Sequence, residues 1–143
     1  MLSEKLKNYN IILASKSPRR QRFFKEMDIA SMNDAAALLI GKQDFSAFSK
    51  LNSDNPICCI KSAYWIKSKN MLIFSIESDR FLYNMVRCIV GTLISLGLGK
   101  ISLVEFKSII MSRDRSIAGC SVPAFGLYLM NIIYPQKYCI ENI

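Results

Sequence analysis

The arrangement of hydrophobic and polar residues along the chain predicts several strands. Residues 9–14, 57–67 and 70–78 are rich in β-branched and aromatic side chains, and the polar residues 68–70 are typical of a hairpin turn between the last two. Residues 126–134 are apolar at almost every position, which predicts a central strand that is buried on both faces. Neighbouring strands joined by short turns favour an antiparallel sheet.

Two short segments have the capping residues of helices. Ser31 or Asn33 can cap a helix that ends before Gly41, and Ser102 can cap a second helix over 103–111. Together with the strands, these segments predict an α+β fold, an antiparallel sheet with helices packed on one face.

A longer helix is predicted from Arg80 to about Leu98, with Asp79 before it as a cap. Its apolar positions form one broad arc, made of Phe81, Leu82, Met85, Val86, Ile89, Leu93 and Leu96. The opposite stripe is narrow and consists of Arg80, Asn84, Arg87, Gly91 and Ser95. Gly91 destabilises a helix interior by roughly 1 kcal/mol, so it suggests that another group approaches the backbone there. Two interpretations stay open: a solvated face, or an Arg87 that faces a cleft and pairs with a buried anion.

Composition narrows the class of partner. The chain has 143 residues, 51% of them hydrophobic, which excludes a disordered tail or a fibrous repeat. Its net charge of +8 indicates a polyanionic partner, RNA or DNA before an anionic membrane. It contains no histidine, which excludes a histidine base, a histidine metal ligand and a Ser-His-Asp triad.

The cysteines and the longest apolar run indicate a cytoplasmic protein. Five cysteines with no CxxC pair favour reduced thiols over a zinc site or a disulfide framework. The apolar run at 88–98 is about half as long as a membrane span. We therefore expect no metal, no membrane segment and a cytoplasmic location.

The strings DRFLYNMVRCIVGTLISLGLGK, FKSIIMSRDRSIAG and SVPAFGLYLMNIIYP follow one another in the second half of the chain. With MNDAAALLIGKQDFSAFSK upstream, residues 32–135 resemble the C-terminal half of TruA-type tRNA pseudouridine synthases. This resemblance implies isomerisation of uridine to pseudouridine in the tRNA anticodon stem-loop, without a cofactor. It implies that Arg87 pairs with the catalytic aspartate, and that Arg80, Lys100, Arg113 and Arg115 contact RNA phosphates.

The catalytic aspartate of that family lies in its N-terminal half, in a motif with no counterpart in this sequence. Asp79 and Asp114 are better interpreted as a cap and a loop residue. We therefore expect a truncated chain that is inactive by itself. The expected partners are tRNA and either a second copy of the chain, as a homodimer, or a separately encoded N-terminal half.

The first 29 residues carry seven basic and three acidic side chains and differ in character from the rest. LKNYNIILASKSPRRQRFFKEMDI resembles the opening of the Maf family of nucleotide pyrophosphatases, with Ser15, Ser17, Arg19 and Arg20 in the phosphate-binding turn. This predicts a gene fusion with two units, a Maf-like strand, turn and helix over 1–30 and a synthase-like domain over 31–143. The alternatives are a non-catalytic RNA-binding remnant and, with less support, a Maf-type pyrophosphatase.

Overall fold

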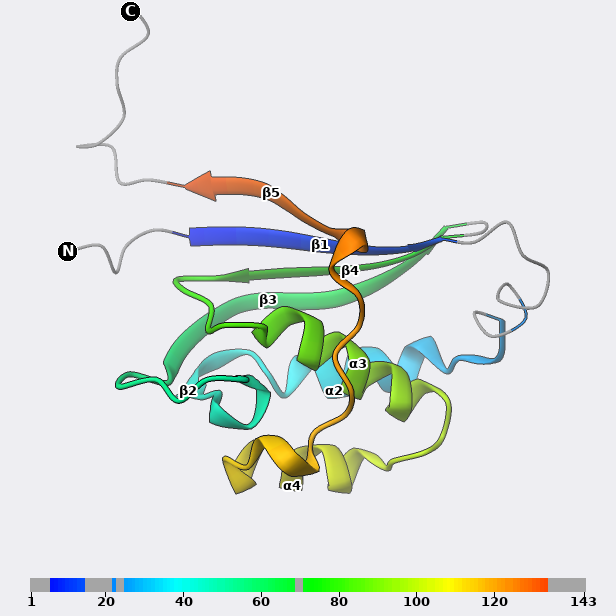
Figure 1. Ribbon diagram of the computed structural model, residues 1–143. Coiled ribbons are helices and arrows are strands. Elements are labelled where there is room, and N and C mark those ends of the chain that lie inside the picture. The colour runs from blue at the N-terminus through cyan, green and yellow to red at the C-terminus, as the bar shows by residue number, and fades with distance from the viewer. Residues whose placement is uncertain (1–5, 15–21, 23–24, 69–70, 134–143) are drawn as a thin grey trace, which may run out of the picture.

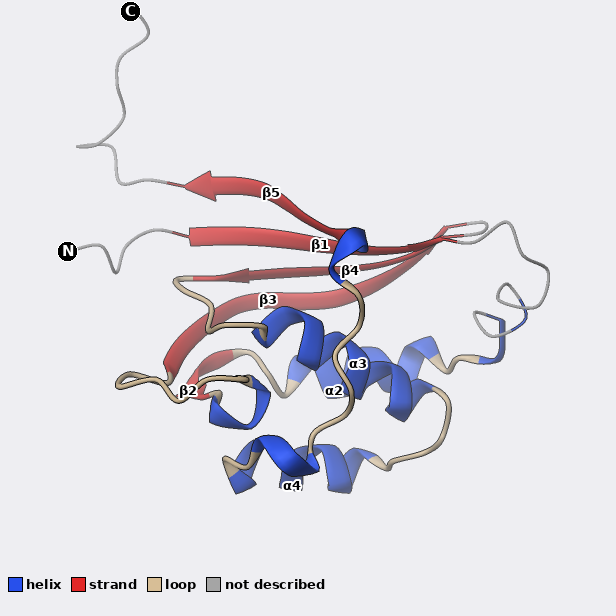
Figure 2. Cartoon of the chain, viewed as in Figure 1, coloured by secondary structure: helices blue, strands red, loops and turns tan. Residues whose placement is uncertain are grey.

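The computed structural model describes residues 6–14, 22, 25–68 and 71–133. In this part of the chain five strands form one antiparallel sheet, and the helices pack against one of its faces (Figures 1 and 2). The α+β architecture predicted from the sequence is therefore confirmed. The strand order is β2-β3-β4-β1-β5, with β1 at Leu6–Ala14, β2 at Gly41–Asp44, β3 at Ile57–Ser68, β4 at Met71–Ser78 and β5 at Leu127–Ile133.

The predicted hairpin is present as β3 and β4, which pair antiparallel from Ser68 opposite Met71 onwards. Alternate residues of the two strands face the helices, and the rings of Trp65 and Phe74, which lie opposite each other, are 4.9 Å apart. Cross-strand aromatic pairs of this kind stabilise a sheet and fix its register.

The N-terminal strand joins the same sheet. β1 pairs with β4 along its length, from Lys7 opposite Ser78 to Ala14 opposite Met71, and with β5 on its other side. The sequence did not decide this placement. As a consequence β5 lies at the edge of the described sheet, so the prediction of a central strand over 126–134 was wrong. An apolar pattern reports hydrophobic composition on both faces and does not report how many neighbouring strands are present.

Among the described residues, three α-helices lie on one side of the sheet: α2 at Ile29–Ala37, α3 at Met85–Gly97 and α4 at Leu103–Ser112. The cap of α4 is confirmed, since Ser102 accepts from the Glu105 amide while Glu105 accepts from the Ser102 amide. The cap of α2 is Asp28, whose Oδ1 accepts from the Ser31 amide at 3.1 Å. The choice of Ser31 or Asn33 was therefore wrong by one turn.

The helix α3 is shorter than predicted, because it begins at Met85 and not at Arg80. Asn84 has φ 62°, a left-handed conformation that a right-handed helix cannot contain. Asp79 does not cap a helix. Its Oδ1 accepts from the Cys59 amide at 2.8 Å and so joins the end of β4 to β3.

The hydrophobic core lies between the sheet and the helices. The largest fully buried side chains are Phe45, Phe48, Phe74, Phe106, Met32, Leu39, Ile60, Leu72, Ile76, Met85 and Ile89. Phe45 precedes the short 3₁₀ helix η2 (Ser46–Phe48), and the ring of its last residue, Phe48, lies 6.2 Å from that of Phe106 in α4. This packing holds the loop after β2 against α4. The loop and Arg113, the residue that follows α4, border the polar cleft described below.

Candidate functional site

Arg87 lines a cleft at the N-terminal end of α3. The cleft has a volume of about 280 Å³ and is bordered by residues 81–87 together with Ala124 and Leu127 at the start of β5. The Arg87 side chain is half-buried, and its Nε donates to the carbonyl oxygen of Val122 at 2.7 Å. Arg87 therefore lies at a cleft, as one of the two interpretations of the polar stripe expected, while its pairing with a buried anion stays a prediction.

The segment 119–122 lies across the polar stripe of α3. A Cβ atom at Gly91 would overlap the carbonyl oxygen of Cys120 and lie 2.8 Å from its carbonyl carbon. A Cβ at Gly119 would lie 2.9 Å from the Cα of Thr92. The two glycines therefore allow direct contact between the helix backbone and the segment backbone. The close approach predicted at Gly91 is confirmed, and the approaching group belongs to the chain itself.

Hydrogen bonds hold this segment in place. The Gly119 amide donates to Thr92 Oγ1 at 2.9 Å, and the Val122 amide donates to the Arg87 carbonyl at 3.1 Å. Arg87 and Val122 are thus joined by two bonds, one from the backbone and one from the guanidinium. This arrangement fixes the direction in which Arg87 leaves the helix, at the wall of the cleft.

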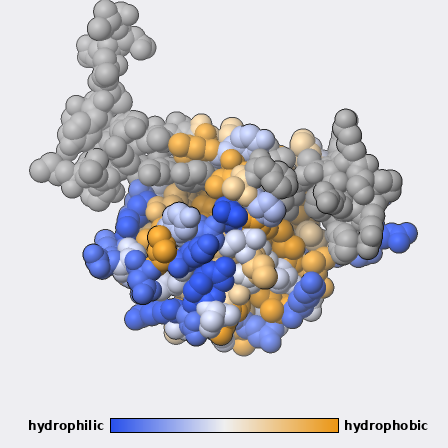
Figure 3. Space-filling model, viewed as in Figure 1, coloured by the Kyte–Doolittle hydropathy of each residue, from blue (hydrophilic) through white to orange (hydrophobic). Residues whose placement is uncertain are grey.

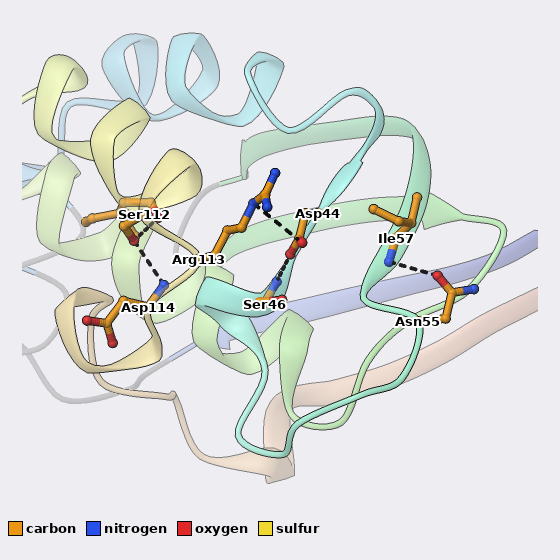
Figure 4. A network of polar contacts seen from close by, with 8 residues as sticks. Asp44, Ser46, Asn55, Ile57, Ser112, Arg113 and Asp114 are labelled. Carbon is orange, nitrogen blue, oxygen red and sulfur yellow. Dashed lines mark hydrogen bonds and ion pairs between the residues drawn. The ribbon is translucent and has the colours of Figure 1, made fainter.

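Among the described residues, no carboxylate lies within 4.0 Å of the Arg87 guanidinium. The ion pair that the described residues do form joins Arg113 Nε to Asp44 Oδ2 at 3.5 Å, as Figure 4 shows. Asp114 caps the 3₁₀ helix η3 (Arg115–Ile117), where hydrogen bonds from the Ser116 hydroxyl and amide hold the pKa of its carboxyl below the usual value. The described part of the chain therefore presents a cation at the cleft without an acidic partner.

The cations predicted to contact RNA lie in different places. Arg113 and Arg115 border a second, polar cleft together with Lys50. Arg80 binds the chain itself, donating to the carbonyl oxygens of Asn55 and Ile57. Lys100 is exposed and follows α3, whose last residue, Gly97, is about 15 Å along the helix from Arg87. Arg113 and Arg115 thus share one cleft, Arg80 bonds to the two residues that flank Pro56 at its border, and Lys100 follows the other end of α3.

Two further residues of the site were not predicted from the sequence. Ser121 Oγ accepts from Asn84 Nδ2 at 2.6 Å and from Arg115 Nη2 at 3.3 Å. Lys50 is brought to the polar cleft by the loop after η2. The sequence carries no periodic signal for either residue, since both lie in irregular segments. The Maf-like residues Ser15, Ser17, Arg19 and Arg20 lie outside the described residues.

Burial alters the chemistry of two cysteines. Removal from water raises the pKa of Cys58 to about 11, and it also raises the pKa of Cys88. These thiols pack inside the fold, while Cys120 is exposed. In the described part of the chain, no three Cys, Asp or Glu side chains gather closely enough to hold a metal ion. No described helix is long and apolar enough to cross a membrane.

Comparison with known proteins finds a family match over most of the chain. Residues 35–135 match the family model of tRNA pseudouridine synthase. The chain is 48% identical to tRNA pseudouridine synthase A of Porphyromonas gingivalis over 117 residues, 79% of this chain and 46% of that protein. It is 39% identical to the protein of the same name from Azobacteroides pseudotrichonymphae over 141 residues, 94% of this chain and 56% of that protein.

The chain thus spans about half the length of the curated relatives it matches. The matched range includes the cleft residues 81–87 and the segment 119–122. It also includes Gly91 and Gly119, the glycines at the contact between α3 and that segment. The family model covers most of the chain, and relatives that carry the family's name are 44–48% identical to it. This chain therefore belongs to the tRNA pseudouridine synthase family.

Proposed function

We propose that this chain supplies the arginine side of a tRNA pseudouridine synthase active site, and that it acts on uridine in the tRNA anticodon stem-loop. The observation that carries the proposal is the position of Arg87. Its Nε is held by Val122 at the wall of a cleft of about 280 Å³, and its guanidinium makes no other hydrogen bond within the described residues. The remaining N–H donors are available for an anion.

The reaction is an isomerisation, so every atom of the uridine is retained. A carboxylate attacks or assists at C1′, and the C1′–N1 bond breaks with its electrons leaving on the uracil. The ring then rotates and C5 bonds to C1′, which releases the carboxylate if it was bound there. C5 loses its proton and N1 gains one. A guanidinium beside the carboxylate keeps it ionised at neutral pH and positions it for attack.

The carboxylate comes from outside the described residues in this proposal. A half-buried guanidinium without a carboxylate partner is unfavourable, which favours a site that a second segment completes. In this proposal the carboxylate belongs to a separately encoded N-terminal half. A second copy of the chain, as in a homodimer, lacks the same motif and does not supply it. We propose that the chain alone is inactive.

The test supplies the missing carboxylate by adding an N-terminal half of the family. The purified chain is mixed with an N-terminal half made from the Porphyromonas gingivalis relative, and pseudouridine is measured in an unmodified tRNA transcript. We expect activity from the mixture and none from either half. Arg87→Met should abolish the activity of the mixture. Turnover by the chain alone would refute the proposed need for a partner.

Two other functions are separated by the same experiment. A non-catalytic RNA-binding remnant of a gene fusion would bind tRNA but stay inactive with every N-terminal half. A Maf-type pyrophosphatase would instead hydrolyse nucleoside triphosphates and would lose that activity on Arg19→Ala. Only the sequence Ser15 to Arg20 supports the second alternative.

A further inference from the structure

A second cleft lies beside the Arg87 cleft and has a different chemistry. It has a volume of about 460 Å³ and is formed by the loop after η2, the end of α4 and the start of η3. Leu82 borders both clefts, so the two are neighbours. Figure 3 shows hydrophilic residues gathered on this face of the molecule, between exposed apolar ones.

Three cations from different segments border this polar cleft. They are Lys50 after η2, Arg113 at the left-handed residue that ends α4, and Arg115 in η3. Asp114 is the one carboxylate of its lining among the described residues. Figure 4 shows Arg113 extending from the end of α4 toward Asp44, with which it forms the 3.5 Å ion pair. The local charge is therefore positive.

Arg115 carries the strongest sign of a missing ligand. Its Nε is buried and makes no hydrogen bond within the described residues, while Nη2 donates to Ser121. A buried N–H without an acceptor costs on the order of 1–3 kcal/mol, so such a group normally has a partner in the working molecule. An anion in the cleft would supply an acceptor. The hydroxyl of Ser46, which also borders the cleft, is a further donor.

The polar cleft and the Arg87 cleft are joined through one hydroxyl. Ser121 Oγ accepts from Arg115 on one side and from Asn84, which lines the Arg87 cleft, on the other. The next residue, Val122, holds the Arg87 guanidinium. A ligand that fixes Arg115 would therefore also fix the segment that positions Arg87.

We propose that the polar cleft binds a backbone phosphate of the same RNA strand whose uridine enters the Arg87 cleft. This inference rests on the proposed function, and it assigns the phosphate contact to Lys50, Arg113 and Arg115. Arg80 and Lys100 lie outside this cleft. The guanidinium fork of Arg115 and the mobile ammonium of Lys50 are both common phosphate ligands.

The test measures binding of an unmodified tRNA transcript by the chain across a range of salt concentrations. Lys50→Gln is the main variant, since the Lys50 side chain is exposed and makes no hydrogen bond to a described side chain. Arg115→Gln is the second variant. Lys67→Gln is the matched control, because Lys67 is also exposed but lies far from the cleft. It is about 33 Å along β3 from Ile57, the residue that follows Pro56 at the border of the cleft.

We expect each cleft variant to weaken binding at low salt and to reduce the slope of log affinity against log salt by roughly 0.7–0.9, the value of one lost phosphate contact. Lys67→Gln should leave the slope unchanged. Equal effects at Lys67 and Lys50, or no salt-dependent binding by the unaltered chain, would overturn the inference. The pseudouridine assay of the mixed halves reports on the proposed function independently of these slopes.

A competition arm separates an RNA phosphate from a free nucleotide. Uridine 5′-monophosphate is added at constant ionic strength to the complex with tRNA. We expect no displacement at micromolar concentrations, because one isolated phosphate lacks the neighbouring contacts of the strand. Displacement at such concentrations would identify a free-nucleotide site and would contradict the proposal.

Discussion

The contact between α3 and the segment 119–122 leads to a quantitative prediction for Gly91→Ala. In an ordinary helix interior this change stabilises by about 1 kcal/mol, because alanine loses less backbone entropy than glycine. Here the added Cβ would overlap the carbonyl of Cys120. The overlapping carbonyl oxygen belongs to the backbone and cannot rotate away as a side chain can. The segment 119–122 must therefore move away from α3.

Three hydrogen bonds depend on that contact: the two between Arg87 and Val122, and the bond from the Gly119 amide to Thr92. Each contributes about 1 kcal/mol net. Their loss outweighs the gain in helix propensity, so Gly91→Ala should destabilise the fold by about 2 kcal/mol. With a urea dependence of about 2 kcal/mol per M, the unfolding midpoint falls by about 1 M.

The assay is equilibrium unfolding in urea, with Gly97→Ala as the control in the same helix. A Cβ at Gly97 would meet the side chain of Met32, with its Cγ at 2.8 Å, and a flexible methionine side chain can shift. We therefore expect a smaller loss for Gly97→Ala than for Gly91→Ala. An unchanged or higher midpoint for Gly91→Ala would refute the reasoning, since helix propensity alone would then account for the result.

Four other predictions concern the helix cap, the thiols and the first strand. Ser102→Ala removes the capping box with Glu105 and should lower stability by about 1 kcal/mol in the same urea assay. Because burial raises the pKa of Cys58 to about 11, the unfolded chain releases this proton first, so stability should fall as pH rises from about 9 to 11. That fall should be smaller in Cys58→Ala, measured by unfolding at several pH values. At pH 8, maleimide should modify the exposed Cys120 faster than Cys58, as peptide mass spectrometry would show. Deletion of residues 1–14 removes the strand between β4 and β5 and should abolish cooperative unfolding, whereas an independent leader would leave the transition intact.

Much of the local structure could be predicted because it depends on neighbours in sequence. The hairpin of β3 and β4 follows from two apolar runs around a polar turn, and the α4 cap follows from Ser102 three residues before Glu105. Arg87 and Gly91 were identified because a narrow polar stripe on an apolar helix is visible in the helical period. These signals act over one or two turns, which is the range that a sequence pattern reports.

The tertiary structure decided the features that join distant parts of the chain. It placed β1 between β4 and β5, which moved β5 to the edge of the described sheet. It brought Lys50 to Arg115, residues that are far apart in sequence and have no shared periodicity. Backbone pairing and packing across a sheet depend on which surfaces meet, and no local pattern specifies that choice. The sequence alone therefore determined most of the strands and helices and the candidate arginine, while folding determined the helix start at Met85 and the cleft in which that arginine lies.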